Sequence, residues 1–170
     1  AQGNPNVMSI LWLEPNFYLK VSKSFGLLLE YRNLFVGRHV YKSFSGYAHG
    51  QEHRMTHHAF KGYMGGKRRE QYERFGYDCK NAAHLIRLLR MCIEFLKDGQ
   101  FYVKRYDAPQ LLEIKRGEWS LGRVQAEAAR LFDLADKAYL ESDLPVSVNL
   151  AEINDLAVLV VRTAIEEFGE

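Results

Sequence analysis

Residues 78–99 read DCKNAAHLIRLLRMCIEFLKDG, and this stretch predicts the central helix of the fold. Apolar residues recur in it every three or four positions, which is the spacing of one face of an α-helix. The pattern begins at Asp78, and Asp98-Gly99 ends it. We therefore expect a helix over 78–97 whose buried face is formed by Ala82, Leu85, Ile86, Leu89, Cys92, Ile93 and Leu96.

The segments on both sides of this helix also favour helices, and they contain no internal repeat. Ser120 can cap one helix, and Asp107 with Gln110 and Asn149 with Glu152 have the spacing of capping pairs. Residues 4–13 are compatible with a short helix or a strand, and 17–21 with an extended segment. The predicted fold is mainly α, a helical bundle-like domain of six or seven helices over 24–35, 39–60, 67–76, 78–97, 107–116, 120–141 and from 149 onward.

Composition limits the classes of function. At 170 residues, 47% hydrophobic and 26% charged, the chain is in the range of an ordinary globular domain. A formal net charge of +2 is too small for a nucleic-acid coat protein, so phosphate binding would need a local cluster of basic residues. No apolar run approaches the roughly 20 residues that span a bilayer, and the N-terminus does not resemble a signal peptide. Cys79 and Cys92 fall on opposite sides of one helix, which predicts no disulfide and favours a cytoplasmic location.

One basic row lies opposite the apolar face of the central helix. At about 100° per residue, Lys80, His84 and Arg87 fall within an arc of roughly 60°. Lysine offers a compact charge and arginine can hold two phosphate oxygens at once, so the row is suited to the phosphates of a nucleotide. His84 could donate a hydrogen bond when protonated, or orient a water. The alternative is a solvated helix face in which Glu94 forms a salt bridge with the row.

Further candidates lie on neighbouring helices. Lys67 and Arg68 precede the central helix by only one short helix, so they could reach the same phosphate or be ordinary surface charges. Tyr47, Gln51 and Arg54 follow one helical stripe that could supply a stacking ring and polar donors to an acceptor such as RNA. Tyr47 could equally belong to the core.

The sequence also contains a stripe of histidines, and it lacks several motifs that mark common enzyme classes. His49, His53 and His57 recur every four residues, but no nearby cysteine or carboxylate pattern completes a metal site, so none is predicted. The sequence has no Gly-rich phosphate loop, no Gly-x-Ser-x-Gly and no Cys-x-x-Cys. It also has no Asp-x-Asp pair, since Glu141-Ser142-Asp143 is interpreted as a turn. The chain alone therefore lacks the carboxylates of two-metal nucleotidyl transfer.

Several strings in the chain resemble one family. They are Asn4-Pro5-Asn6-Val7, Phe44-x-Gly46-Tyr47-Ala48 with Gln51 and Arg54-Met55, Gly76-Tyr77-Asp78-x-Lys80-x-Ala82-x-His84-Leu85-x-Arg87-Leu88-Leu89-Arg90, Leu111-Leu112-x-Ile114-x-x-Gly117-x-Trp119-Ser120, and Ser142-x-Leu144-Pro145. Together they resemble the predicted nucleotidyltransferases of the DNA polymerase β superfamily, including the RNA-ligase-associated proteins. The resemblance covers nearly the whole chain.

The resemblance implies a protein of two parts, a catalytic α/β domain and a helical portion. In that family an N-terminal α/β domain carries the Gly-Ser and Asp-x-Asp motifs that hold Mg²⁺ and the nucleoside triphosphate, and a helical portion follows. This chain would then be the helical C-terminal portion of a longer enzyme, with 1–22 a remnant or edge of the upstream domain and 23–170 the helical domain. Lys80, His84, Arg87 and Arg90 would form a polar wall near the nucleotide or the acceptor. The alternative is a non-catalytic module that binds RNA or docks a partner during RNA repair.

Overall fold

The computed structural model describes residues 22–57 and 66–169. These residues form seven α-helices and one 3-10 helix and contain no strand, which confirms the mainly α, bundle-like fold. The predicted extended segment and nearly all of the predicted domain 1–22 lie outside the described residues. The helices are α2 (Lys23–Glu30), η3 (Arg32–Phe35), α3 (Val40–Thr56), α4 (Gly66–Phe75), α5 (Cys79–Asp98), α6 (Ala108–Lys115), α7 (Leu121–Glu141) and α8 (Leu150–Phe168).

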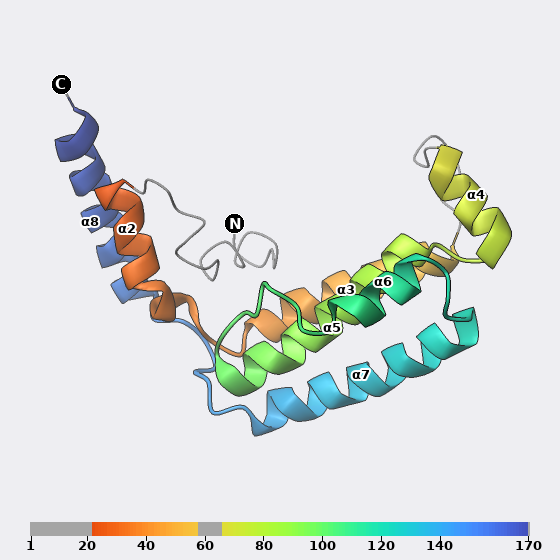
Figure 1. Ribbon diagram of the computed structural model, residues 1–170. Coiled ribbons are helices and arrows are strands. Elements are labelled where there is room, and N and C mark those ends of the chain that lie inside the picture. The colour runs from red at the N-terminus through yellow and green to blue at the C-terminus, as the bar shows by residue number, and fades with distance from the viewer. Residues whose placement is uncertain (1–21, 58–65, 170) are drawn as a thin grey trace.

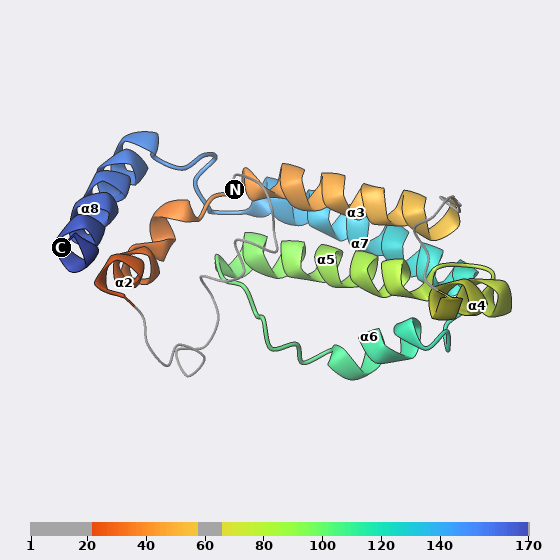
Figure 2. The ribbon, with the colours of Figure 1, turned by 90° about the horizontal axis from the view of Figure 1, so that it is seen from above.

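Helix α5 is the centre of the molecule. It lies between α3 and α6, and α7 packs along a third side of it (Figures 1 and 2). Six of the seven residues predicted for its apolar face are buried, and Ile93 is partly buried against the same core. Leu88, Met91 and Phe95 are buried as well, because α5 is covered on more than one side. The four-helix unit of α3, α5, α6 and α7 is called the body below.

Local sequence signals set both ends of α5. The carboxylate of Asp78 accepts hydrogen bonds from the backbone N–H groups of Lys80 (3.1 Å) and Asn81 (3.0 Å), so Asp78 is the N-cap of the helix that the sequence predicts to begin there. Gly99 ends the helix in the left-handed conformation at φ 67°, which a residue without Cβ adopts at little cost. Just before the helix, the buried hydroxyl of Tyr77 donates to the carbonyl of Trp119 at 2.7 Å. That bond joins the start of α5 to the segment that leads into α7.

The predicted capping pair at the start of α6 is wrong. Asp107 occupies the N-cap position, but its side chain makes no capping hydrogen bond. Its carboxylate instead accepts from Nη1 of Arg90 on α5 at 2.8 Å, and Gln110 accepts from Nη2 of the same guanidinium. A charged donor offers Asp107 a stronger hydrogen bond than a backbone amide does, and the result is an attachment of α6 to α5.

The same attachment extends to two further carboxylates. Nη2 of Arg90 also donates to Glu127 on α7 at 3.1 Å. Arg105, in the segment before α6, donates from Nε to Asp107 at 2.8 Å and forms an ion pair with Glu94 on α5. These side chains are at most 18% exposed, so the network is shielded from solvent and is expected to hold α5, α6 and α7 in register. We call it the Arg90 network.

Helices α2 and α8 form a separate arm. They pack against each other beyond one end of the body, as both ribbon views show (Figures 1 and 2). Only Ser24 of α2 and Leu156 of α8 are buried. Glu167 near the end of α8 accepts hydrogen bonds from the backbone N–H groups of Lys23 (3.0 Å) and Ser24 (3.2 Å). The arm therefore has a polar tie at one end and almost no core of its own.

The helix predicted over 24–35 is broken in the structure. Helix α2 ends at Glu30, Tyr31 leaves the helical conformation at φ −94° and ψ 18°, and η3 follows. The break is a local tightening into 3-10 geometry, in which Leu34 N–H bonds to Tyr31 O and Val36 N–H bonds to Asn33 O. Such tightening is common where a helix terminates and the chain must turn, as it does here to enter α3.

Two further predictions concern the cysteines and the membrane. Cys79 and Cys92 are both buried free thiols, as their positions on opposite sides of α5 predict. Burial raises the pKa of both, in the case of Cys92 to about 12. Within the ranges that the structure describes, no helix combines the length and the apolar character that crossing a bilayer requires.

Candidate functional site

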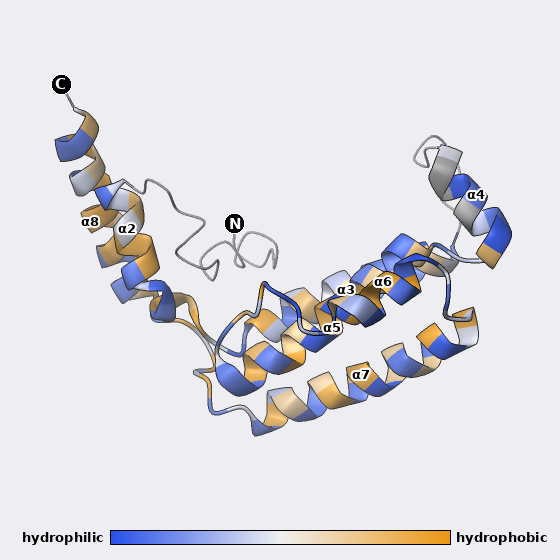
Figure 3. Cartoon of the chain, in the orientation of Figure 1, coloured by the Kyte–Doolittle hydropathy of each residue, from blue (hydrophilic) through white to orange (hydrophobic). Residues whose placement is uncertain are grey.

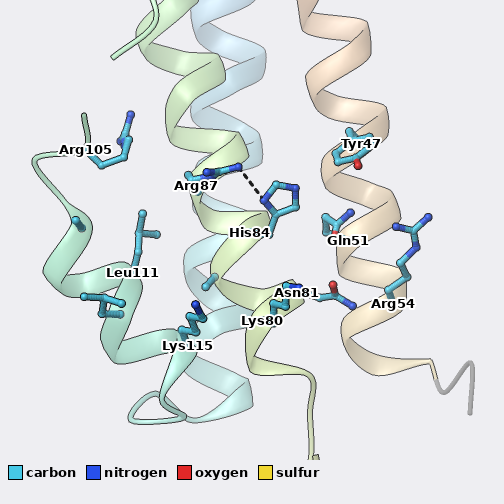
Figure 4. Close-up of a pocket in the computed structure, with 13 residues that line it drawn as sticks. Tyr47, Gln51, Arg54, Lys80, Asn81, His84, Arg87, Arg105, Leu111 and Lys115 are labelled. Carbon is cyan, nitrogen blue, oxygen red and sulfur yellow. Dashed lines mark hydrogen bonds between the residues drawn. The ribbon is translucent and has the colours of Figure 1, made fainter. Parts of the chain in front are cut away.

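A groove of about 630 Å³ runs over α5 between α3 and α6 (Figure 4). Helix α5 forms its floor, α3 forms one wall, and α6 with the segment before it forms the other. The lining residues are Tyr47, Gln51 and Arg54 of α3, Lys80, Asn81, Ala83, His84 and Arg87 of α5, and Arg105, Ala108, Leu111, Leu112 and Lys115 of the α6 wall.

The structure brings together two sets of residues that the sequence singled out separately. The basic row of α5 lies on the floor, and the stripe of Tyr47, Gln51 and Arg54 faces it from α3 (Figure 4). Tyr47 is 37% exposed, which places it in the groove wall and not in the core. Its ring meets the imidazole of His84 edge-on, with centroids 5.8 Å apart. Contact between Tyr47 and His84 therefore joins the α3 wall to the floor of the groove.

Three other candidates are placed differently. Arg90 does not line the groove, because its guanidinium is held by Asp107, Gln110 and Glu127 in the Arg90 network. It acts on the site by fixing the α6 wall to α5. Lys67 and Arg68 lie in the first turns of α4, beyond the end of the body opposite the arm, and their side chains lie outside the described part of the chain.

Arg87 and His84 form the polar centre of the floor. Nη2 of Arg87 lies 3.2 Å from Nδ1 of His84 (Figure 4). Because a guanidinium can only donate, Nδ1 accepts, and the proton of the neutral imidazole is on Nε2. Nε of Arg87 is buried and has no hydrogen-bond partner among the described residues. A half-buried guanidinium thus has donor capacity that the protein itself leaves unused.

The electrostatics of the floor keep His84 neutral. Burial, together with the charges of Arg87 and Lys80, lowers the pKa of His84 to about 4. Near pH 7 His84 is therefore neutral and can donate through Nε2, so donation by a protonated ring, one of the two predicted roles, would require acidic pH. Burial and the charge of Arg105 also lower the pKa of Arg87, which nevertheless remains a cation at neutral pH because arginine starts from a very high value.

Positive charge lines the groove without matching acids. Five cationic side chains line it, and among the lining residues that the structure describes there is no Asp or Glu. The charge of Arg105 is compensated by Glu94 and Asp107. The other four, which have no ion pair within residues 22–57 and 66–169, are Arg54, Lys80, Arg87 and Lys115. Since a cation that lacks an acidic partner favours an external anion, the lining is suited to phosphate or carboxylate ligands.

The α6 wall was not predicted. Ala108, Leu111, Leu112 and Lys115 have the spacing of one helix face, so the stripe itself is visible in the sequence. What the spacing does not reveal is that this face meets the basic row of α5. That depends on the Arg90 network, whose partners on α6 are separated from Arg90 by 17 and 20 residues.

The histidine stripe of α3 does not converge on one point. The rings of His53 and His57 stack on each other with centroids 4.2 Å apart, whereas His49 stacks on Phe132 of α7 at 4.3 Å. Nδ1 of His49 also lies 3.5 Å from a carboxylate oxygen of Glu52. The three rings are thus engaged in two separate contacts.

Comparison with known proteins adds no family to this picture. No family model matches, and no curated protein or solved structure shows significant similarity to the chain. The likeness to nucleotidyltransferases stays a prediction from the sequence strings. The function proposed below therefore rests on the residues that line the groove.

Proposed function

We propose that the groove over α5 binds the phosphate groups of a nucleotide. The observation that supports this most directly is Arg87, a half-buried guanidinium that no carboxylate among the described residues neutralises and whose Nε has no partner. Burying a cation in this state is unfavourable unless a counter-charge joins it. A phosphate supplies that charge, and its oxygens accept from the Arg87 guanidinium and from Nε2–H of neutral His84.

The rest of the lining fits the remainder of a nucleotide. Lys80 and Arg54 are exposed cations that can neutralise further phosphate oxygens. Leu111 and Leu112 give the α6 wall an apolar surface, and the ring of Tyr47 stands across the groove from them. A volume of about 630 Å³ is within the range of small-molecule sites. The groove therefore combines a cationic floor for phosphate with apolar and aromatic walls for a base or a ribose.

The resemblance stated above extends this proposal to a reaction. On that reading, the chain is the nucleotide- or acceptor-binding helical portion of a metal-dependent nucleotidyltransferase, which moves a nucleoside monophosphate from a triphosphate to an acceptor. The lining residues do not fit a Mg²⁺ site, because hard divalent cations take carboxylate oxygens and this lining has none. The metal-holding carboxylates would come from outside this chain, and we assign to its own residues only the binding of phosphate.

The absence of carboxylates from the lining also supports a second candidate, a module that binds RNA without catalysis. An RNA backbone does not need a protein carboxylate to hold a metal beside its phosphates, and unpaired cations along a groove are the usual means of binding it. On this alternative Tyr47 would stack on an unpaired base.

The test is a pair of lysine variants on the same helix. Lys80→Ala removes an exposed cation from the groove, whereas Lys97→Ala removes an exposed cation from the far end of α5, outside the groove. Both variants change the net charge equally. We expect Lys80→Ala to weaken the binding of a nucleoside triphosphate about tenfold, since hydrogen bonds to charged groups contribute about 1.5–3 kcal/mol, and Lys97→Ala to leave binding unchanged. Isothermal titration calorimetry measures both; equal affinities in the two variants would overturn the proposal.

Competition separates the two candidates. A labelled single-stranded RNA is bound to the protein, and a nucleoside triphosphate is added at constant ionic strength while fluorescence anisotropy is recorded. Displacement of the RNA supports a nucleotide site. RNA that stays bound, with an affinity that falls steeply with salt, supports the RNA-binding module instead.

A further inference from the structure

Helix α8 has a second apolar face that nothing in the described structure covers. Its first face, which includes the buried Leu156, packs against α2. The second face carries Leu150, Val158, Val161, Ile165 and Phe168, which are 51% to 69% exposed. Orange, apolar residues recur along α8 in Figure 3. Part of this face borders a shallow hollow of about 550 Å³. We call it the α8 seam.

The spacing of the seam is that of a helix-pairing surface. From Val158 to Phe168 its members alternate steps of three and four residues, the repeat that lets two helices remain in contact along their length. The positions in this repeat are Ala151, Asn154, Val158, Val161, Ile165 and Phe168. Leu159, which is also exposed, lies about 100° or more around the helix from each exposed apolar residue of the seam, beyond the polar flank that Asp155 and Glu166 form. Apolar exposure on α8 is therefore organised on one side and isolated on the other.

We propose that the α8 seam binds the α8 seam of a second copy of this chain, with the two helices antiparallel. In this orientation Phe168 faces the partner's Ala151, Ile165 faces the partner's Asn154, and Val161 faces the partner's Val158. Volume is thus complementary at the ends and equal at the centre. A parallel pair would place two alanines together at one end and two phenylalanines at the other.

Charge also favours the antiparallel pair. Asp155 and Arg162 lie beside the seam, and in the same register each is within about half a turn of its opposite on the other copy, Asp155 beside the partner's Arg162. The two-fold axis repeats the contact, so two equivalent pairs of opposite charges form at the rim. The interface is isologous, because the same surface is used by both copies, and it therefore forms a closed dimer.

The size of the seam sets the expected affinity. Its five exposed side chains leave on the order of 500 Å² of apolar surface on each copy, taking about 100–200 Å² for a fully exposed side chain of this kind. A standard specific interface covers about 800 Å² on each partner, so the seam is smaller than a standard interface and falls among weak, transient contacts, and we expect a reversible dimer with a micromolar dissociation constant. Pairing would also turn two arms of two helices each into a four-helix bundle with a core, which neither arm has alone.

The test compares two glutamate substitutions that are two residues apart in sequence but lie on different sides of α8. Val161→Glu puts a charge in the seam, and Leu159→Glu puts the same charge on the opposite side of α8. Sedimentation equilibrium from about 1 to about 200 µM covers the expected range of dissociation constants. We expect the unaltered chain to dimerise, Val161→Glu to raise the dissociation constant at least tenfold, and Leu159→Glu to change it less than threefold. Circular dichroism checks that both variants keep their helix content.

A charge reversal tests the orientation. Asp155→Arg places two cations together in the antiparallel pair and should weaken it a fewfold, and adding Arg162→Asp to the same chain should restore the original affinity. A chain that stays monomeric across the range, or a dimer that the two glutamate variants weaken equally, would overturn the proposal. A dimer whose dissociation constant is unchanged by both charge substitutions would contradict the proposed antiparallel orientation.

Discussion

The body and the arm are both built from amphipathic helices, yet they are stabilised in different ways. In the body, α5 alone contributes eleven buried residues, and the Arg90 network adds a shielded set of ion pairs. In the arm, α2 and α8 contribute one buried residue each. Two helices that meet along a single line cannot enclose a side chain on all sides, whereas a central helix covered by three others can. Burial, and not helix formation, distinguishes the two regions.

This difference also separates their roles. A groove that must hold ligand donors within a few tenths of an ångström is built on rigid, well-packed elements. The groove over α5 meets that condition, because its floor is the helix with the largest buried share. The arm keeps apolar surface available, which suits association and not fixed chemistry.

The largest expected effect comes from cavities in the two regions. Leu85→Ala in α5 should lower the free energy of unfolding by about 2–5 kcal/mol, since the side chain is fully buried and its surroundings cannot collapse. Leu156→Ala removes the same atoms from α8 but should cost only about 1–2 kcal/mol, because half-exposed neighbours can move in and water can enter. Urea unfolding followed by circular dichroism measures both. Equal losses would show that the arm is as tightly packed as the body.

An intermediate effect is expected from the Arg90 network. Arg90→Met removes one of the two cations from each of Asp107 and Glu127 and the donor from Gln110, and it should cost roughly 2–4 kcal/mol. Arg130→Met is the matched control, because Arg130 also bonds Glu127 but is 58% exposed, and it should cost no more than about 0.5 kcal/mol. The same unfolding assay applies. If the two variants are equally stable, the network does not hold α6 to α5 and α7.

The smallest of these effects is a pH dependence that belongs to the body. Because the folded pKa of His84 is about 4 and its ordinary value is 6.5, the unfolded chain binds a proton between these values that the folded chain does not. Stability contributed by neutral His84 is therefore present above pH 6.5 and is lost as the pH falls toward 4, by roughly 1–3 kcal/mol. Unfolding midpoints at pH 7 and pH 4.5 should differ less in His84→Gln than in the unaltered chain. An identical pH dependence in both would contradict the assignment.

Local chemistry accounts for what could be predicted from the sequence. Ser120 and Asn149 cap their helices as expected, because a cap depends on residues two or three positions away. Periodicity likewise predicted the buried face of α5 and the two stripes that meet in the groove. Asp107 has the same local pattern as a cap, but its carboxylate accepts from Arg90, which is distant in sequence, and not from the backbone of α6. A short-range pattern is thus reliable only while no charged partner competes for the side chain.

The remaining features depend on packing that no single segment contains. The α6 wall enters the site because of contacts that join three helices. The neutrality of His84 depends on burial and on Arg87 and Lys80 together. Arg90 belongs to the same string of residues as Lys80 and Arg87, yet it points into a cluster of acids while they face the groove. Sequence spacing identifies helix faces, whereas the neighbour that each face meets is a property of the assembled fold.

The two buried thiols of α5 have a practical value for observing this molecule. A maleimide or other thiol label reacts with the thiolate, and a pKa of about 12 at Cys92 leaves almost none of that form near pH 7. Cys79 is buried and its pKa is raised in the same direction. A cysteine introduced on the exposed side of α7 and another on the outer side of α8 would therefore take fluorophores without prior removal of the native residues. Energy transfer between such dyes would follow the separation of arm and body in single molecules.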